Sequence, residues 1–318
     1  MTCIRFLLLA LLVALAGCGE PDDNYDGIDF KTCGIRPHAV LPVVFRGNVP
    51  VVHATIKGQP ATLILDTGAT GLVLTETALH RLDLQTDQNR LIISHGVGGE
   101  TKSFAGKLQD FQIEGMHVPD HPVSVLPNTS VMVSKNLVDG LFGGDVLANF
   151  EVDLDLPHRQ VTLYAGRLCA DTRLPPWTVP YDTIDASGSA NLRFVVPVEL
   201  DGHKLTAMID TGAAGSIVAA DVALALGVTT EMLQQGPRAT LVGTGPASAY
   251  AYVHSFREIR VGDDTYQGPM LLVAERPDPK VDIIIGSDYL IQHHLWLSYA
   301  TKRVFIERAP QHSADGRR

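Results

Sequence analysis

The sequence predicts a mostly β protein built from two similar lobes, and three observations support this prediction. The tripeptide Asp-Thr-Gly occurs at 66–68 and again at 210–212, each time at the end of an apolar run. An apolar-Gly-x-Asp-x-Leu element also occurs twice, with its glycine-to-leucine part at 143–147 and 286–290. Short stretches of strand-forming residues separated by glycine turns fill both halves, and helical patterns are few. A repeat of this length indicates a duplicated domain, not a solenoid array.

Both halves begin with a predicted β-hairpin that ends at the tripeptide. Gly58 and Gly202 are the turn residues, and each stands at the same distance before its aspartate. The apolar patterns then predict the remaining elements: strands at 51–56, 61–65, 72–74, 194–200, 205–209 and 217–218, short helices at 77–84 and 220–226, and extended chain at 151–164 and 295–306.

Polar and proline-containing stretches mark the limits of the predicted domains. An acidic segment poor in apolar residues follows the N-terminus, and a polar stretch with Pro175-Pro176 separates the halves. The predicted organisation is a signal segment at 1–17, a tether at 18–38, an N-terminal lobe at 39–166, a linker at 167–191, a C-terminal lobe at 192–308 and a polar tail at 309–318.

The N-terminus has the composition of a targeting segment. Arg5 precedes an apolar run that is too short for a spanning helix but suits a signal peptide. The run ends in Leu15-Ala16-Gly17-Cys18, which resembles the bacterial lipobox. We therefore expect cleavage before Cys18, lipidation of its thiol, and a periplasm-facing lipoprotein held only by its lipid, with the outer membrane favoured by Gly19. The alternative is an ordinary cleaved signal with a chance cysteine.

Processing would leave Cys33 and Cys169 as a pair in an oxidising compartment. We expect a disulfide between them that brackets the first repeat, and the alternative is two free thiols. The formal net charge of −10, the pI near 5.6 and the lack of any basic run argue against a nucleic-acid partner.

Asp66 and Asp210 are the candidate catalytic residues, because two carboxylates on equivalent turns can share one proton. Acids about 3 Å apart cannot both ionise, so one keeps its proton and the other acts as a base. In each turn the glycine allows close backbone approach, the next small residue leaves amides free to face the carboxylate, and the threonine hydroxyl can bond across to the other turn. The supporting residues are Thr67, Gly68, Thr211 and Gly212.

These turns and the two Gly-x-Asp-x-Leu elements resemble those of the retropepsin-like aspartic proteases. The resemblance covers roughly 48–165 and 192–307, and implies two barrel lobes packed as an intramolecular pseudo-dimer. It implies an endopeptidase that acts on peptides as a monomer and needs no cofactor or metal. It also identifies the glycine-rich stretches after each aspartate as flaps over the substrate, and the candidate flap residues are Val97, Gly98, Gly99, Thr244 and Gly245. Two ordinary β-turns are the alternative.

Competing readings remain for several features. Asp145 and Asp288 also recur, but each precedes a short helical pattern, so we expect them to be structural helix N-caps. The histidines show no metal-ligand spacing, and neither a phosphate loop nor a serine-hydrolase elbow is present. Two alternatives to a monomeric protease stay open: a non-catalytic peptide-binding lipoprotein that retains the fold, and lobes that pair with another chain.

Overall fold

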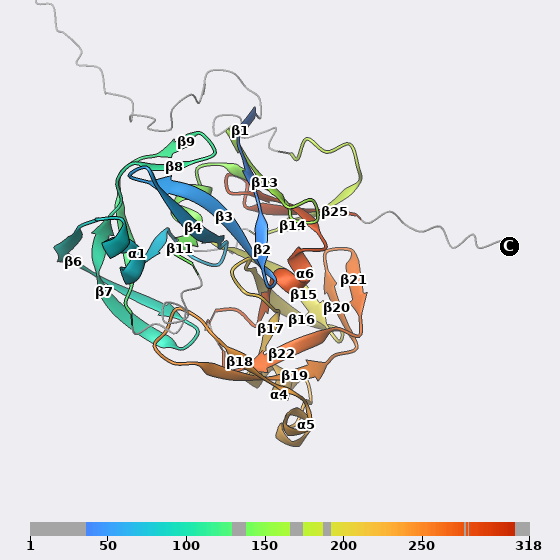
Figure 1. The fold of residues 1–318 in the computed structure, drawn as a ribbon. Coiled ribbons are helices and arrows are strands. Elements are labelled where there is room, and N and C mark those ends of the chain that lie inside the picture. Colours follow the sequence, from blue (N-terminus) through green and yellow to red (C-terminus); the bar gives the residue numbers. More distant parts are fainter. Residues whose placement is uncertain are drawn as a thin grey trace, which may run out of the picture.

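The computed structural model describes residues 36–128, 138–165, 174–186, 192–276, 278 and 280–308. Strands dominate these residues, and each helix is only one or two turns long. Figure 1 shows two lobes, one coloured blue to green and the other yellow to orange, and strands from both halves of the chain build a third sheet that joins them. The predicted fold class, two similar barrel-like β lobes in an intramolecular pseudo-dimer, is confirmed.

In the described residues the N-terminal lobe consists of one ten-stranded sheet and two short helices. Its path is β6-β7-β10-β5-β11-β4-β3-β8-β9, with β2 paired to β3. In chain order the elements are β2 (Val44–Arg46), β3 (Val49–Ile56), β4 (Gln59–Leu65), β5 (Val73–Thr75), α1 (Glu76–Arg81), β6 (Thr86–Gly96), β7 (Gly99–Lys107), β8 (Phe111–Ile113), β9 (Met116–Val118), β10 (Pro122–Leu126), β11 (Gly140–Phe142) and α3 (Gly144–Leu147).

The C-terminal lobe repeats this path strand for strand as β18-β19-β22-β17-β23-β16-β15-β20-β21. Both lobes contain two parallel pairs among antiparallel ones: β4 with β11 and β5 with β10 in the first lobe, and β16 with β23 and β17 with β22 in the second. The elements are β15 (Phe194–Leu200), β16 (His203–Ile209), β17 (Ile217–Ala219), α4 (Ala220–Ala225), α5 (Thr230–Gln235), β18 (Arg238–Leu241), β19 (Ala249–Ser255), β20 (Glu258–Val261), β21 (Asp264–Gln267), β22 (Met270–Ala274), β23 (Ile283–Ile285) and α6 (Ser287–Leu290).

The predicted hairpins begin both lobes, and their turns explain the glycines. Ile56 pairs with Gln59, and Leu200 pairs with His203, so each loop has two residues. Gly58 and Gly202 have φ of +71° and +82°, which a side chain would strain. Both residues of each loop have positive φ, as in the turns that match the right-handed twist of paired strands.

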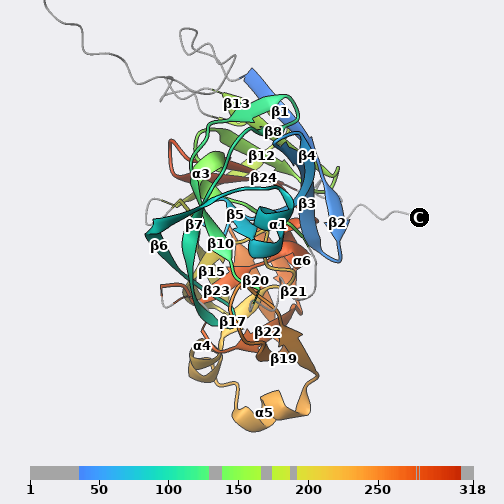
Figure 2. The same cartoon turned by 60° about the vertical axis from the view of Figure 1, so that its left-hand side comes forward.

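A six-stranded sheet joins the two lobes, with the order β1-β13-β12-β24-β25-β14. Its central pair is β12 from the end of the first half and β24 from the end of the second. Figure 2 shows β1, β12, β13 and β24 together at one end of the molecule. The strands are β1 (Arg36–Pro42), β12 (Glu151–Asp155), β13 (Gln160–Ala165), β14 (Tyr181–Asp185), β24 (His294–Ser298) and β25 (Arg303–Glu307).

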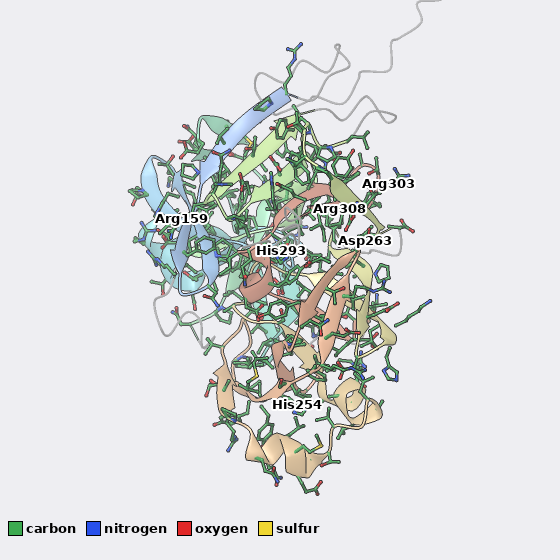
Figure 3. The ribbon with its side chains drawn as sticks, turned by 90° about the vertical axis from the view of Figure 1, so that its right-hand side faces the viewer. Arg159, His254, Asp263, His293, Arg303 and Arg308 are labelled. Carbon is green, nitrogen blue, oxygen red and sulfur yellow. The ribbon has the colours of Figure 1, made fainter. Side chains whose placement is uncertain are left out.

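Strand β14 lies within the segment that the sequence assigned to the linker, and β1 begins within the predicted tether. Arg308, just after β25, fastens this edge of the sheet to the C-terminal lobe. It donates hydrogen bonds to Asp182 of β14 and, over 2.9 Å, to Asp263 between β20 and β21 (Figure 3). Strand β14 therefore makes part of the segment between the lobes a member of the shared sheet.

One continuous apolar core runs through both lobes and the shared sheet. The indole of Trp296 in β24 is fully buried where the halves meet, and its ring nitrogen donates to Glu151 of β12 over 3.3 Å. Two smaller clusters lie apart from this core, one in each lobe, and include Ala69 and Ala213 directly after the two Asp-Thr-Gly turns. Both turns are therefore set in apolar surroundings.

Candidate active site between the two lobes

Asp66 and Asp210 occupy equivalent places, directly after the central strands β4 and β16. The amide of Asp66 donates to the carbonyl of Phe142 at the end of β11, and the amide of Asp210 donates to Ile285 at the end of β23, both over 3.0 Å. The parallel pairing of β4 with β11 and of β16 with β23 places these strand ends together. Both aspartates thus leave a rigid sheet at a fixed point.

The turns hold one oxygen of each carboxylate. The amides of Gly68 and Ala69 donate to Asp66 Oδ1 over 2.9 and 2.8 Å. The amides of Gly212 and Ala213 donate to Asp210 Oδ1 over 2.9 and 3.2 Å. Because the same oxygen is held twice in each turn, the other oxygen is directed away from the turn. This geometry agrees with the expected role of the small residues after each aspartate.

The two threonines bind the turns to each other. The amide of Thr67 donates to Thr211 Oγ1 over 3.0 Å, and the amide of Thr211 donates to Thr67 Oγ1 over 3.1 Å. Each hydroxyl in turn donates to a carbonyl of the opposite lobe, Thr67 to Ile209 over 2.9 Å and Thr211 to Leu65 over 2.6 Å. Both side chains are fully buried. These four hydrogen bonds fix how the lobes meet at the site.

The two glycines bring the carboxylates together. A Cβ atom on Gly68 would lie 2.4 Å from Cγ of Asp210, and one on Gly212 would lie 2.5 Å from Cγ of Asp66. Each carboxylate therefore rests on the glycine of the opposite turn, in space that any side chain would fill. The two carboxyl groups therefore lie close together, and both residues remain partly exposed.

Burial and proximity favour a shared proton. Burial raises the pKa of Asp66 well above the ordinary aspartate value, and the negative charge of Asp210 raises it further. Burial also raises the pKa of Asp210, but hydrogen bonds from the Gly212 amide and from the Asp66 carboxyl hold this rise back. The pair therefore binds one proton far more readily than two separate aspartates would.

Asp145 and Asp288 hold the chain just beyond the two turns. Asp145 Oδ1 accepts from the Leu72 amide over 2.8 Å. Asp288 accepts from the amide of Ser216 over 2.9 Å and from its hydroxyl over 2.7 Å. The prediction that these aspartates are helix N-caps is wrong, because the N-cap residues of α3 and α6 are Gly143 and Gly286. Their carboxylates accept hydrogen bonds from backbone amides, as expected for structural residues.

The glycine-rich stretches form the tips of two projecting elements, the β6–β7 hairpin and the connection between β18 and β19, and the tips touch. The amide of Gly245 donates to the carbonyl of Val97 over 2.9 Å, and the amide of Ala247 donates to Gly98 over 3.2 Å. Thr244 contacts the first tip too, since a Cβ on Gly96 would lie 2.0 Å from Thr244 Oγ1. The structure thus brings four of the five candidate flap residues together, with Gly99 beside them at the start of β7.

The second tip also reaches the wall of the first lobe. Val242, just before Gly243, packs on the small apolar cluster of the N-terminal lobe that includes Ala69 and Val73. Since Ala69 follows Asp66 in the first turn, this cluster links the flap of one lobe to the turn of the other.

The comparison with known proteins agrees with the geometry of this site. A sequence model described as aspartyl protease matches residues 52–146 and 196–289, which together make up more than half of the chain. Each matched segment contains one Asp-Thr-Gly turn and all but the final leucine of its Gly-x-Asp-x-Leu element. The chain belongs to the aspartyl protease family. A 95-residue segment is also 36% identical to the UBA domain-containing protein Mud1 of Schizosaccharomyces pombe, over 30% of this chain and 27% of that protein. The chain therefore aligns with only about a quarter of that relative's length.

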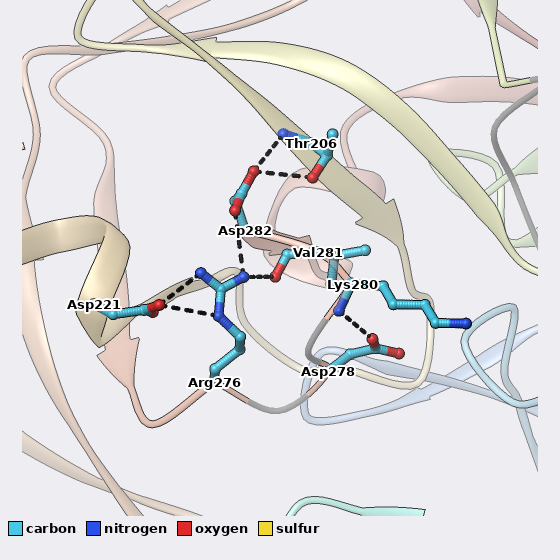
Figure 4. A network of polar contacts seen from close by, with 7 residues as sticks. All are labelled: Thr206, Asp221, Arg276, Asp278, Lys280, Val281 and Asp282. Atoms are coloured by element: carbon cyan, nitrogen blue, oxygen red, sulfur yellow. Dashed lines mark hydrogen bonds and ion pairs between the residues drawn. The ribbon is translucent and has the colours of Figure 1, made fainter. Parts of the chain in front are cut away.

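Sequence analysis missed a second duplicated feature of this aspartyl protease fold. Asp282 accepts from the amide and hydroxyl of Thr206 over 3.0 and 2.9 Å and also binds Arg276 (Figure 4). In the N-terminal lobe Asp139 accepts from the amide of Thr62 and from Arg81, both over 2.8 Å. The recurring Asp before the apolar-Gly-x-Asp-x-Leu element was the available signal. The arginines come from different places in the two lobes, so they leave no repeat to find.

The cysteine predictions concern residues beyond those that the structure describes. Cys18, Cys33 and Cys169 all lie outside the described ranges, so lipidation and the disulfide stay predictions. Among the described residues no cluster of side chains has the composition of a metal site, and no helix is long and apolar enough to span a membrane.

Proposed function

We propose that this protein is an aspartic endopeptidase that uses Asp66 and Asp210 as its catalytic pair. The observation that carries the proposal is the meeting of the two carboxyls, each resting on the glycine of the opposite turn and each partly open to solvent. A shared proton in an apolar setting supplies an acid and a base side by side, which amide hydrolysis requires.

In the proposed mechanism a water molecule lies between the two carboxyls. The ionised aspartate takes one proton from this water as its oxygen attacks the carbonyl carbon of the substrate. The protonated aspartate donates its proton to the carbonyl oxygen, which gives a neutral tetrahedral diol. The proton taken from water then passes to the leaving nitrogen, the C–N bond breaks, and the diol returns its other proton to the pair as the new carboxyl forms. No covalent intermediate with the protein is required.

The two touching tips would act as flaps in this reaction. The carbonyls of Val97 and Gly98 accept from the amides of Gly245 and Ala247 in the structure, so the same groups are available to a peptide backbone when the tips part. Closure over a bound peptide would exclude bulk water and strengthen the electrostatic action of the pair.

Peptide cleavage by single variants tests the proposal. The purified protein, Asp66→Asn and Asp210→Asn are incubated with a mixed peptide library over acidic to neutral pH, and products are identified by mass spectrometry. Asp83→Asn is the matched control, because the Asp83 side chain is 97% exposed and pairs with Lys57 at the surface. We expect cleavage by the parent and the control and a loss of at least about 1000-fold in each active-site variant.

Two results would decide against the endopeptidase. Equal cleavage by an active-site variant and the parent would exclude the pair as the catalyst. Peptide binding by the parent without turnover at any pH would favour the alternative, a binding protein that retains the fold.

We also propose that the protein works as a monomer, anchored to the cell envelope by lipid on Cys18. Both aspartates of the pair come from one chain, so a second copy is not needed to complete the site. Palmitate labelling in a bacterial host tests the anchor, with label expected in the parent and lost in Cys18→Ser. Sedimentation of the active species tests the monomer.

A further inference from the structure

The two lobes differ at the position directly opposite the catalytic aspartates. In the C-terminal lobe Phe194 pairs with Ile209, and one further step of the antiparallel ladder places Arg193 opposite Asp210. In the N-terminal lobe Val51 pairs with Ile64, and the same ladder extended places Val49 opposite Asp66. Side chains directly opposite in such a ladder lie on the same face of the sheet. One aspartate therefore faces an arginine where the other faces a valine.

Arg193 is held in place by a buried ion pair. Its Nη1 donates to Asp278 Oδ2 over 2.7 Å, and the two side chains are only 18% and 14% exposed. Asp278 itself is fixed by the amide of Lys280 over 2.8 Å (Figure 4). The buried Nε of Arg193 has no hydrogen-bond partner among the described residues. A guanidinium in so little water interacts with a neighbouring carboxylate more strongly than a surface arginine would.

The other charged and titratable groups around the pair do not stand directly opposite either aspartate in the two hairpin ladders. Tyr299 lies against Phe194 with ring centroids 4.7 Å apart, and burial raises the pKa of its phenol, so that it stays neutral. Lys302 lies over the same two rings, farther along the chain. Behind the turns, the remaining carboxylates are already engaged by backbone amides and by side chains, His121 beside Asp145 and Ser216 beside Asp288.

We propose that Arg193 is a positioning residue that places the shared proton, keeping Asp210 ionised as the base and leaving the proton on Asp66 as the acid. The assignment of the two roles to acid and base rests on the proposed endopeptidase function, whereas the placement of the proton does not. The positive charge of Arg193 contributes to holding down the pKa of Asp210, after the hydrogen bonds from the turn and from Asp66. The duplicated site is thus made asymmetric by one residue.

The proton placement has a consequence for the pH dependence. The first ionisation of the pair, as pH rises, generates the base, and the charge of Arg193 favours that ionisation. Removing the charge should therefore move the lower step of the pair to higher pH, by roughly one unit, which is a tenfold change in acid dissociation constant. The acidic limb of kcat/KM should move by the same amount, because it follows the same step.

Carbon-13 NMR of labelled aspartate carboxyls measures the placement without any need for catalysis. The two signals are assigned with Asp66→Asn and Asp210→Asn and then titrated in the parent, Arg193→Gln and Arg193→Lys. Arg260→Gln is the matched control, because Arg260 pairs with Glu199 farther along β15 and away from the site. We expect the Asp210 carboxyl to ionise before the Asp66 carboxyl in the parent, in Arg193→Lys and in the control. In Arg193→Gln the ionisation of Asp210 should move to higher pH.

Other NMR results would contradict the proposed proton placement. The proposal would be overturned if the ionisation of Asp210 stayed at the same pH in Arg193→Gln. It would also be overturned if Asp66 ionised before Asp210 in the parent. If Arg193→Gln fails to fold because Asp278 is left buried and unpaired, the double variant with Asp278→Asn removes both charges and should show the same shift, smaller in size. If the carboxyl signals behave as expected but no peptide is cleaved, the proton placement stands and the endopeptidase fails.

Discussion

The amide of Thr67 donates to the hydroxyl of Thr211 over 3.0 Å, and the amide of Thr211 donates to the hydroxyl of Thr67 over 3.1 Å. This reciprocal pair crosses the boundary between two halves of one chain. The hydroxyls continue to carbonyls just before each aspartate, so the same atoms that join the lobes also set the backbone from which the carboxyls extend. The same hydrogen bonds therefore hold the two lobes together and build the site.

Thr211→Val should destabilise the protein and impair the site together. The change removes one donor and one acceptor and leaves the buried amide of Thr67 and carbonyl of Leu65 without partners, at a cost of about 1–3 kcal/mol. Urea unfolding measures the loss. Thr265→Val, at an exposed position in β21, is the control and should change stability by no more than about 0.5 kcal/mol. Equal stability of the two variants would contradict the structural role of the crossing bonds.

Gly212→Ala should abolish activity while leaving most of the fold. The new methyl group would lie 2.5 Å from Cγ of Asp66, so the carboxyls must move apart and can no longer share a proton. In Gly215→Ala the new methyl group would lie 3.3 Å from the end of the Leu272 side chain and 3.8 Å from Oδ2 of Asp288, so the effect should be smaller. Activity and circular dichroism of both variants check this. A fully active Gly212→Ala would show that close approach of the carboxyls is not required.

Asp282→Ala should weaken the C-terminal lobe. The variant leaves the Thr206 amide and the Arg276 guanidinium without their shared acceptor, and we expect a loss of about 1–3 kcal/mol. Asp139→Ala should cost a similar amount in the N-terminal lobe, since Thr62 and Arg81 lose the same support. Denaturant unfolding compares both with Glu199→Ala, which removes a surface pair worth at most about 1 kcal/mol. A loss no larger than that of the control would refute this role.

His294 should make the shared sheet more stable at acidic than at alkaline pH. Burial lowers its pKa, but Asp153 at 2.7 Å and Glu307 at 2.8 Å outweigh burial, and the net pKa is raised. A raised histidine pKa contributes stability that is complete below the unfolded value of about 6.5 and is lost as pH rises through the folded value. We expect the unfolding free energy to fall as the pH rises through that window.

The contribution of His294 is isolated by replacement. His294→Asn should flatten this part of the pH profile, whereas His158→Asn, at a histidine whose side chain is 81% exposed, should leave the slope unchanged. Urea unfolding at several pH values provides the comparison. A slope that survives in His294→Asn would assign the pH dependence to another group.

The sequence predicted the features that are local and duplicated. Asp66 and Asp210 were found because a turn that presents a carboxylate needs threonine, glycine and a small residue in order, and that order occurs twice. The short helices after each turn were predicted at nearly their observed bounds. Local features of this kind can be predicted from a single sequence.

Other features depend on residues far apart in the chain, and the sequence did not reveal them. Strand β14 pairs only with β25, so nothing nearby identifies it as a strand. Arg193 binds Asp278 across 85 positions, and Asp139 binds Thr62 across 77. The helix caps were predicted wrongly because Asp145 and Asp288 accept hydrogen bonds from residues far back in the chain, just after the two turns. Nothing in the sequence of the two short helices indicates these contacts.

Binding of a transition-state mimic tests the central claim most directly. A peptide that the protein cleaves is compared by calorimetry with an analogue in which a secondary alcohol replaces the scissile carbonyl and its amide link. If Asp66 and Asp210 share one proton around the attacked carbon, the parent should bind the analogue at least about 100-fold more tightly, and both Asp→Asn variants should lose that preference. Equal affinity of the parent for the two peptides, or a preference that survives in either variant, would contradict the account.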